Sequence, residues 1–212
     1  MNFDEFLISI SKIKNLELPG QTSQFKMSPP FRKELLKKYE DKITSAKRAG
    51  VMALFYPNEE RKTMLVLILR KTYNGVHSAQ IGFPGGKVES NETMEMAAIR
   101  ETYEEIGIKA HKIEVLKALT EIYIPPSNFY VQPFIGLSKN NLAFIKQDEE
   151  VEEIVEVELN HFLDEAAITS QSVETSYSVK IQVPAFKLNG YVVWGATAMM
   201  LSEIKDLLKE IL

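Results

Sequence analysis

Residues Gly86–Ile108 read GKVESNETMEMAAIRETYEEIGI. Seven positions in this stretch stand at fixed spacing: Gly86, Glu92, Arg100, Glu101, Glu104, Glu105 and Gly107, which an aliphatic Ile108 follows. Such a pattern arises by chance at roughly 10⁻⁹ to 10⁻⁸ per start position, given ordinary residue usage of about 5–7% each. The spacing therefore indicates a specific chemical requirement.

The stretch predicts a loop followed by a helix. Paired glycines at the end of Phe83–Gly86 permit a close backbone approach, and the proline fixes φ. A helix is predicted over about 91–106, with Ser90 or Asn91 as N-cap and Gly107 as the C-terminal stop.

The helix is amphipathic at ~100° per residue. Its apolar stripe, expected to pack on the core, consists of Met96, Ile99, Tyr103 and Ile106. The opposite face carries Glu101, Glu104 and Glu105, which crowd together at i, i+3 and i+4. Like charges at these spacings destabilise a helix unless a cation compensates them, and Mg²⁺ prefers carboxylate oxygens. These three glutamates are the predicted metal ligands; a solvated acidic face is the alternative.

The stretch resembles the Nudix box, G-x5-E-x7-R-E-U-x-E-E-x-G-U, where U is a bulky aliphatic residue. Every glycine and charged position matches, and Thr102 departs at the first U, which is a packing position. The resemblance implies an α/β/α sandwich with a mixed β-sheet. It also implies that the strand–loop–helix unit binds Mg²⁺ or Mn²⁺ and cleaves a diphosphate joined to another moiety.

Other segments resemble the coenzyme A pyrophosphatase subfamily of Nudix hydrolases. They are residues 77–86, 123–129, 150–151 and 194–198. The first departs from the subfamily motif, with Gly75 in place of an arginine and Ala79 in place of a glycine. The resemblance implies hydrolysis of coenzyme A or its derivatives to 3′,5′-ADP and 4′-phosphopantetheine. The departures leave open ADP-ribose, a nucleotide sugar or an oxidised nucleoside triphosphate as substrate. A non-catalytic nucleotide-binding regulator is a further alternative, although such modules tend to lose the box carboxylates.

The expected site residues follow from this resemblance. The catalytic residues are Glu101, Glu104, Arg100 and Glu150. The substrate-binding residues are His77, Gln80, Gly85, Gly86 and Arg70. Arg100 is expected to hold Glu101 in position by a charge-assisted hydrogen bond. Glu150 lies in an acidic run, residues 148–153, which is otherwise read as a solvated segment.

Composition limits the class of protein. The 212 residues suffice for one domain with a real core, and 45% hydrophobic with 25% charged content is ordinary for a globular protein. The net charge of −4 predicts no nucleic-acid partner. The absence of cysteine excludes disulfides, thiolate metal sites and a cysteine nucleophile. No signal peptide or membrane span is predicted, and a cytoplasmic enzyme of small-molecule diphosphates is expected.

The predicted organisation is an N-terminal helical extension, residues 1–50, before a Nudix domain, residues 51–212. The extension carries two apolar helical patterns, around Phe3–Ile10 and Phe31–Ile43, and is read as a cap, a homodimer contact or a substrate lid. Strands are predicted over 51–56, 64–69, 113–123, 129–137, 155–159, 179–186 and 191–194. Turns are predicted at 74–75 and 189–190, and a helix closes the chain.

Overall fold

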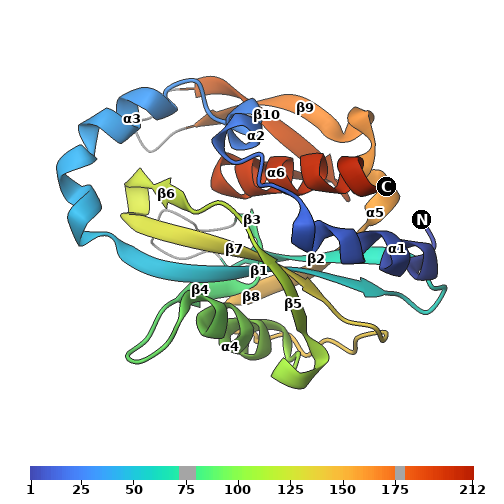
Figure 1. The fold of residues 1–212 in the computed structure, drawn as a ribbon. Helices are drawn as coiled ribbons and strands as arrows, with labels where there is room; N and C mark the ends of the chain where they lie inside the picture. The colour runs from blue at the N-terminus through green and yellow to red at the C-terminus, as the bar shows by residue number, and fades with distance from the viewer. Residues whose placement is uncertain (72–79, 175–179) are drawn as a thin grey trace.

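A mixed β-sheet lies between two layers of helices in the computed structural model (Figure 1). The described residues are 1–71, 80–174 and 180–212. Helix α4 (Met94–Ile106) covers one face of the sheet, whereas α1 (Phe3–Ile10) and α6 (Gly195–Ile211) cover the other. Each helical layer packs on its own buried apolar cluster. The predicted α/β/α sandwich is therefore confirmed.

Eight strands of the described residues form this sheet: β1 (Lys47–Pro57), β2 (Thr63–Arg70), β3 (Ile81–Gly82), β4 (Gly85–Lys87), β5 (Glu114–Ala118), β6 (Ile122–Ile124), β7 (Phe129–Leu137) and β8 (Val151–Glu158). Strands β1 and β7 pair in parallel, whereas β2 and β4 pair antiparallel with β1. Strands β5 and β6 pair with β7, and β3 and β8 pair with β2. The sheet is mixed because one parallel pair stands among antiparallel ones.

The predicted strands are present with different bounds. The first begins at Lys47, four residues before the predicted start, and the predicted strand over 113–123 is two strands, β5 and β6. Both pair antiparallel with β7: β5 pairs with residues 134–137 and β6 with residues 129–131. Strands β3 and β4 were not predicted because two or three residues are too short to show a periodic pattern.

A second sheet of three strands, β9 (Ile168–Glu174), β10 (Lys180–Leu188) and β11 (Tyr191–Trp194), lies beyond α6 (Figure 1). Asn189 and Gly190 join β10 to β11 with φ of 50° and 86°, as a tight hairpin requires. The predicted hairpin is therefore confirmed. The sequence pattern did not reveal β9 or the short α5 (Leu159–Leu163). The predicted turn at 74–75 lies outside the described residues.

Helix α4 differs from the prediction at its start and on its buried face. Thr93 caps it, accepting a hydrogen bond from Met96 N, and Asn91 stands before it in the left-handed region at φ 64°. Met96 and Tyr103 of the predicted core stripe are 53% and 51% exposed. The buried positions are Ala97, Ala98, Thr102, Glu105 and Ile106.

Close packing of α4 against β1 explains why Ala97 and Ala98 are buried in place of Met96 and Tyr103. A Cβ on Gly50 of β1 would lie 1.8 Å from the Met94 carbonyl oxygen, so the helix backbone lies almost on the strand. Only small side chains fit at such a distance, and Ala97 and Ala98 supply them. The larger Met96 and Tyr103 side chains consequently face away from the sheet.

The N-terminal segment packs on the main body. Phe3, Phe6 and Ile10 of α1 are buried in the same cluster as α6, and the Phe6 ring lies 5.4 Å from that of Phe55. The short α2 (Gln21–Gln24) follows, and Gln24 Nε2 donates to Glu203 of α6 at 3.0 Å.

Helix α3 (Arg32–Lys38) has no buried residue and is shorter than the predicted second helix, because the chain continues as 3₁₀-helix from Glu40 to Ser45. It arches over one end of the sheet (Figure 1). Within the part of the chain that the structure describes, no helix is both long and apolar enough to cross a bilayer.

Candidate active site

Strand β4 brings a glycine pair against helix α4. Gly85 and Gly86 pair with Val51 and Gly50 of β1. Gly85 has φ of 147°, and a Cβ there would meet Gly50 O at 2.4 Å. A Cβ on Gly86 would lie 2.4 Å from the Glu101 carboxylate carbon. Gly85 is thus required for the close approach of β4 to the backbone of β1, whereas Gly86 leaves space for the Glu101 carboxylate.

Three carboxylates meet beside this pair. One oxygen each from Glu101, Glu105 and Glu150 lies within 4.8 Å of the other two. Glu101 and Glu105 are one turn apart on α4, whereas Glu150 immediately precedes β8. These three residues are called the carboxylate cluster below.

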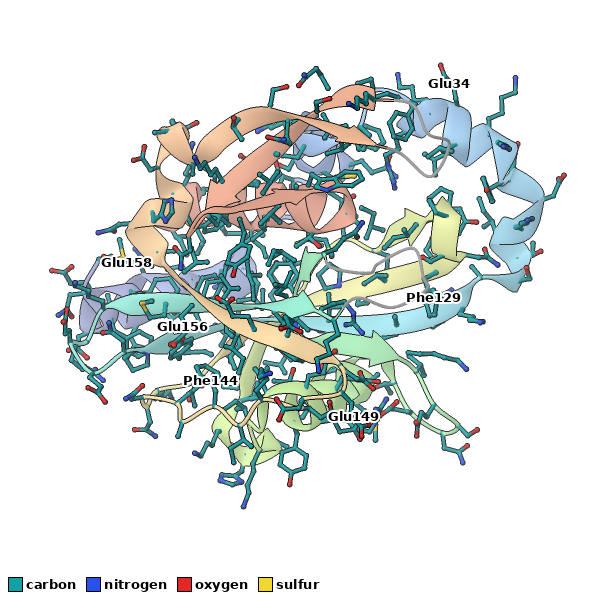
Figure 2. All side chains as sticks on the ribbon, turned by 180° about the vertical axis from the view of Figure 1, so that it is seen from behind. Glu34, Phe129, Phe144, Glu149, Glu156 and Glu158 are labelled. Carbon is teal, nitrogen blue, oxygen red and sulfur yellow. The ribbon has the colours of Figure 1, made fainter. Side chains whose placement is uncertain are left out.

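The segment before β8 is fixed to the end of α4 by backbone hydrogen bonds. Ile145 N donates to Ile106 O, and Gln147 N donates to Glu105 O, both at 3.0 Å. The Gln147 side chain in turn accepts from Glu150 N at 2.8 Å. Figure 2 shows Glu149 of this segment beside α4. Glu105 and Glu150 are far apart in the sequence, so no local pattern predicted their proximity, and Glu150 was expected in the site from the subfamily resemblance of residues 150–151.

Glu105 is the most buried member of the cluster, with 2% of its side chain exposed. Its Oε1 accepts from Arg70 Nη1 at 2.9 Å, and its Oε2 accepts from Gly85 N at 2.8 Å. Burial raises the pKa of Glu105 to about 7, although Arg70 and the Gly85 N–H oppose this shift. Burial also raises the pKa of Glu101. The fold therefore holds two crowded, poorly hydrated carboxylates, an arrangement that a divalent cation would stabilise.

Arg100 connects the motif positions to one another. Its Nε and Nη2 donate to the two Glu92 oxygens at 2.9 and 3.1 Å, and Nη2 also donates to Lys87 O at 3.0 Å. Its Nη1 donates to Glu101 Oε1 at 2.9 Å. These bonds raise the pKa of Arg100 and lower that of Glu92. Arg100 thus fixes one carboxylate of the cluster while its own position is set by Glu92.

Glu104 is not one of the three carboxylates of the cluster, but it shares the Arg100 guanidinium with Glu101. Its side chain is 52% exposed and accepts from Arg100 Nη1 at 2.8 Å. The role of Glu104 as metal ligand and catalytic residue stays a prediction. His77 lies outside the described residues.

A cavity of about 640 Å³ opens next to the cluster. Arg70, Gln80, Gly85 and Gly86, all predicted substrate-binding residues, lie in its wall. The remaining wall comes from α3, from the loop between β6 and β7, and from the start of α6. Phe129, labelled in Figure 2, is one of the wall residues. The contribution of α3, with Phe31, Arg32 and Leu35, had no signal in the sequence beyond an amphipathic pattern.

Comparison with known proteins agrees with this architecture. The model of the NUDIX domain matches residues 46–174, more than half of the chain, so the chain belongs to the NUDIX domain family. Enzymes of this family are pyrophosphohydrolases that use divalent metal ions, and this protein is a Nudix hydrolase.

Two relatives illustrate the distance within the family. Nudix hydrolase 3 of Caenorhabditis elegans is 26% identical over 159 residues, which cover 68% of this chain and 66% of that protein. The uncharacterized Nudix hydrolase NudL of Yersinia pestis (strain Pestoides F) is 28% identical over 141 residues, which cover 66% of this chain and 70% of that protein. The match thus spans just under two thirds of the worm protein's length.

Solved structures show the same fold. A Nudix hydrolase from M. smegmatis, RenU, superposes with a TM-score of 0.56 at 17% identity, covering 79% of this chain and 88% of that one. A MutT/nudix family protein from Enterococcus faecalis gives a TM-score of 0.50 at 18% identity, and the superposition covers 77% of this chain and 62% of that one.

Proposed function

We propose that this protein hydrolyses the diphosphate of coenzyme A or its derivatives to 3′,5′-ADP and 4′-phosphopantetheine or its acyl form. One observation carries the proposal. Three of the four segments that resemble the coenzyme A pyrophosphatase subfamily are far apart in the sequence, yet each of the three contributes wall residues to the cavity beside the carboxylate cluster. The wall residues from these segments are Gln80, Gly82, Phe83, Gly85 and Gly86, then Ile124, Pro125, Pro126, Ser127 and Phe129, then Trp194, Gly195, Ala196 and Thr197. A shared cavity is what a common ligand would require.

The residues present fit a divalent cation. Glu101, Glu105 and Glu150 offer oxygen ligands within 4.8 Å of one another, which suits Mg²⁺ or Mn²⁺. Glu104 is a further ligand in this proposal, since it lies one turn from Glu101. When bound, the cation would neutralise diphosphate charge and lower the pKa of a coordinated water.

The chain's own groups hold this site in shape. Arg100 and the Gly85 N–H fix Glu101 and Glu105, each through a bond of 2.8–2.9 Å. Glu150 is more exposed than either, and in this proposal it takes the proton from the attacking water. Gln80 and Arg70, which line the cavity, are the substrate-binding side chains in this proposal. Preorganised carboxylates of this kind supply both proton transfer and orientation.

Product identification tests the proposal. The purified protein is incubated with coenzyme A and Mg²⁺ or Mn²⁺, and the products are identified by mass spectrometry. We expect 3′,5′-ADP and 4′-phosphopantetheine. A parallel panel contains ADP-ribose, a nucleotide sugar and an oxidised nucleoside triphosphate. Rapid hydrolysis of one of these with coenzyme A left intact would overturn the proposed substrate, and binding without hydrolysis of any diphosphate would indicate a regulatory module.

A further inference from the structure

Arg32 at the start of α3 lies in the wall of the cavity. Its Nη2 donates to Tyr123 O on β6 at 2.8 Å, and its backbone N donates to Pro29 O at 3.0 Å. The side chain is therefore attached to the sheet rather than extended into solvent.

The guanidinium lacks a counter-ion among the described residues. Among the residues whose side chains the structure describes, no ion pair involves Arg32, and its buried Nε has no acceptor. The part of the cavity wall that the described residues form contains no aspartate or glutamate. Burial lowers the pKa of Arg32 to about 10, so the group remains charged at neutral pH. A partly buried cation without a partner is costly, and a ligand anion would remove that cost.

The pairing of the strands separates Arg32 from the carboxylate cluster. Lys87 of β4 lies opposite Ala49 of β1, Ala49 opposite Val131 of β7, and Val131 opposite Ile122 of β6. Tyr123, which anchors Arg32, follows Ile122. Three inter-strand spacings of about 4.8 Å place it roughly 14 Å from β4. A diphosphate held at the cluster is too short to reach this position, so the anion at Arg32 is a separate substituent of the ligand.

We infer that Arg32 binds a second anionic group of the substrate, a phosphate monoester on the nucleotide arm, and so selects diphosphates that carry one. The inference rests on the proposed function, in which the 3′-phosphate of coenzyme A is that group. Arginine is suited to the role because its fork of donors matches phosphate oxygens.

Binding of nucleotides without a scissile diphosphate tests this inference independently of turnover. Affinities for 3′,5′-ADP and for 5′-AMP, which lacks the second phosphate, are measured by calorimetry. Wild-type protein should prefer 3′,5′-ADP by about ten- to hundred-fold, the loss typical of a hydrogen bond between charged groups. Arg32→Met should abolish this preference by weakening 3′,5′-ADP alone, and Arg32→Lys should retain part of it.

The control is Lys33→Met, which removes the same charge from the exposed neighbouring position of α3 and should leave the preference unchanged. Equal affinities for the two nucleotides in the wild type would overturn the inference. So would an equal loss of both affinities in Arg32→Met, because that result would assign Arg32 to supporting the cavity through Tyr123.

Turnover separates the inference from the proposed function. The kcat/KM ratio for coenzyme A over dephospho-coenzyme A should fall about ten- to hundred-fold in Arg32→Met, with hydrolysis of dephospho-coenzyme A retained. A wild type that hydrolyses neither compound refutes the proposed function, whereas the nucleotide affinities still decide the role of Arg32.

Discussion

Substitution of Gly86 by alanine should damage the active site while sparing the fold. The backbone of Gly86 is outside the left-handed region, so alanine is permitted there. Its Cβ would, however, lie 2.4 Å from both Cδ and Oε1 of Glu101. Non-bonded heavy atoms are stable at about 3.5 Å or more, so the carboxylate must withdraw by roughly 1 Å.

Catalysis should respond far more than stability. A displacement of about 1 Å typically costs roughly 10²-fold in rate, and we expect that fall in kcat. The atoms displaced are the end of a flexible side chain, so the free energy of unfolding should change by about 1 kcal/mol or less. Affinity for Mn²⁺ should weaken in parallel, because the displaced Glu101 carboxylate no longer lies close enough to those of Glu105 and Glu150 to share a cation with them.

The assay combines steady-state turnover, Mn²⁺ titration calorimetry and chemical denaturation. Gly82→Ala is the control for metal binding: Gly82 lines the cavity, but among the described residues its Cβ would meet only Thr197 Oγ1 at 3.9 Å, so its Mn²⁺ affinity should equal that of the wild type. A folded Gly86→Ala enzyme with wild-type kcat and Mn²⁺ affinity would refute the reasoning. A large loss of stability would refute it equally.

Three further predictions concern the same unit. Gly50→Ala should lower the free energy of unfolding by about 3 kcal/mol or more in urea denaturation, because its Cβ would meet backbone of Met94 at 1.8 Å; a change below about 1 kcal/mol would contradict the close packing of α4. Glu105→Gln should slow turnover by at least roughly 10²-fold, and near-normal turnover would remove Glu105 from the mechanism. The melting temperature of the metal-free protein should not fall, because the raised pKa of Glu105 means that its ionised form is disfavoured in the fold. The pKa of Glu92 is lowered below 4.5 by Arg100, so its contribution to stability should be complete above pH 4.5 and be lost as the pH falls through the folded-state pKa. The stability difference between wild type and Glu92→Gln should therefore shrink on acidification, and a constant difference from pH 7 to pH 3 would exclude this linkage.

The motif predicted the local structure well because its residues act within one loop and one helix. Gly107 ends α4 at φ 76°, as a C-terminal glycine should, and Arg100 bonds Glu101 as the spacing indicated. The hairpin at Asn189–Gly190 is also a local signal. Such features depend on interactions between residues close in the sequence.

The predicted buried face of α4 was wrong at Met96 and Tyr103 and right at Ile106, because periodicity records hydrophobicity and not distance. Met96 and Tyr103 are the larger apolar groups, yet the approach of the helix to Gly50 leaves space only for Ala97 and Ala98. Thr102, which departs from the family pattern, is fully buried, and its hydroxyl donates to Ala98 O at 2.6 Å. Its polar group is thereby satisfied within the helix.

The sequence by itself indicated the family and two carboxylates of the cluster through residue types at fixed spacing, and the family resemblance implied the layered fold. Only the tertiary structure brought Glu150 to Glu101 and Glu105, turned Glu104 toward Arg100 and placed Arg32 in the cavity wall. The physical reason is that these arrangements depend on strand pairing and on backbone contacts between segments that are distant in the chain, which no local pattern encodes.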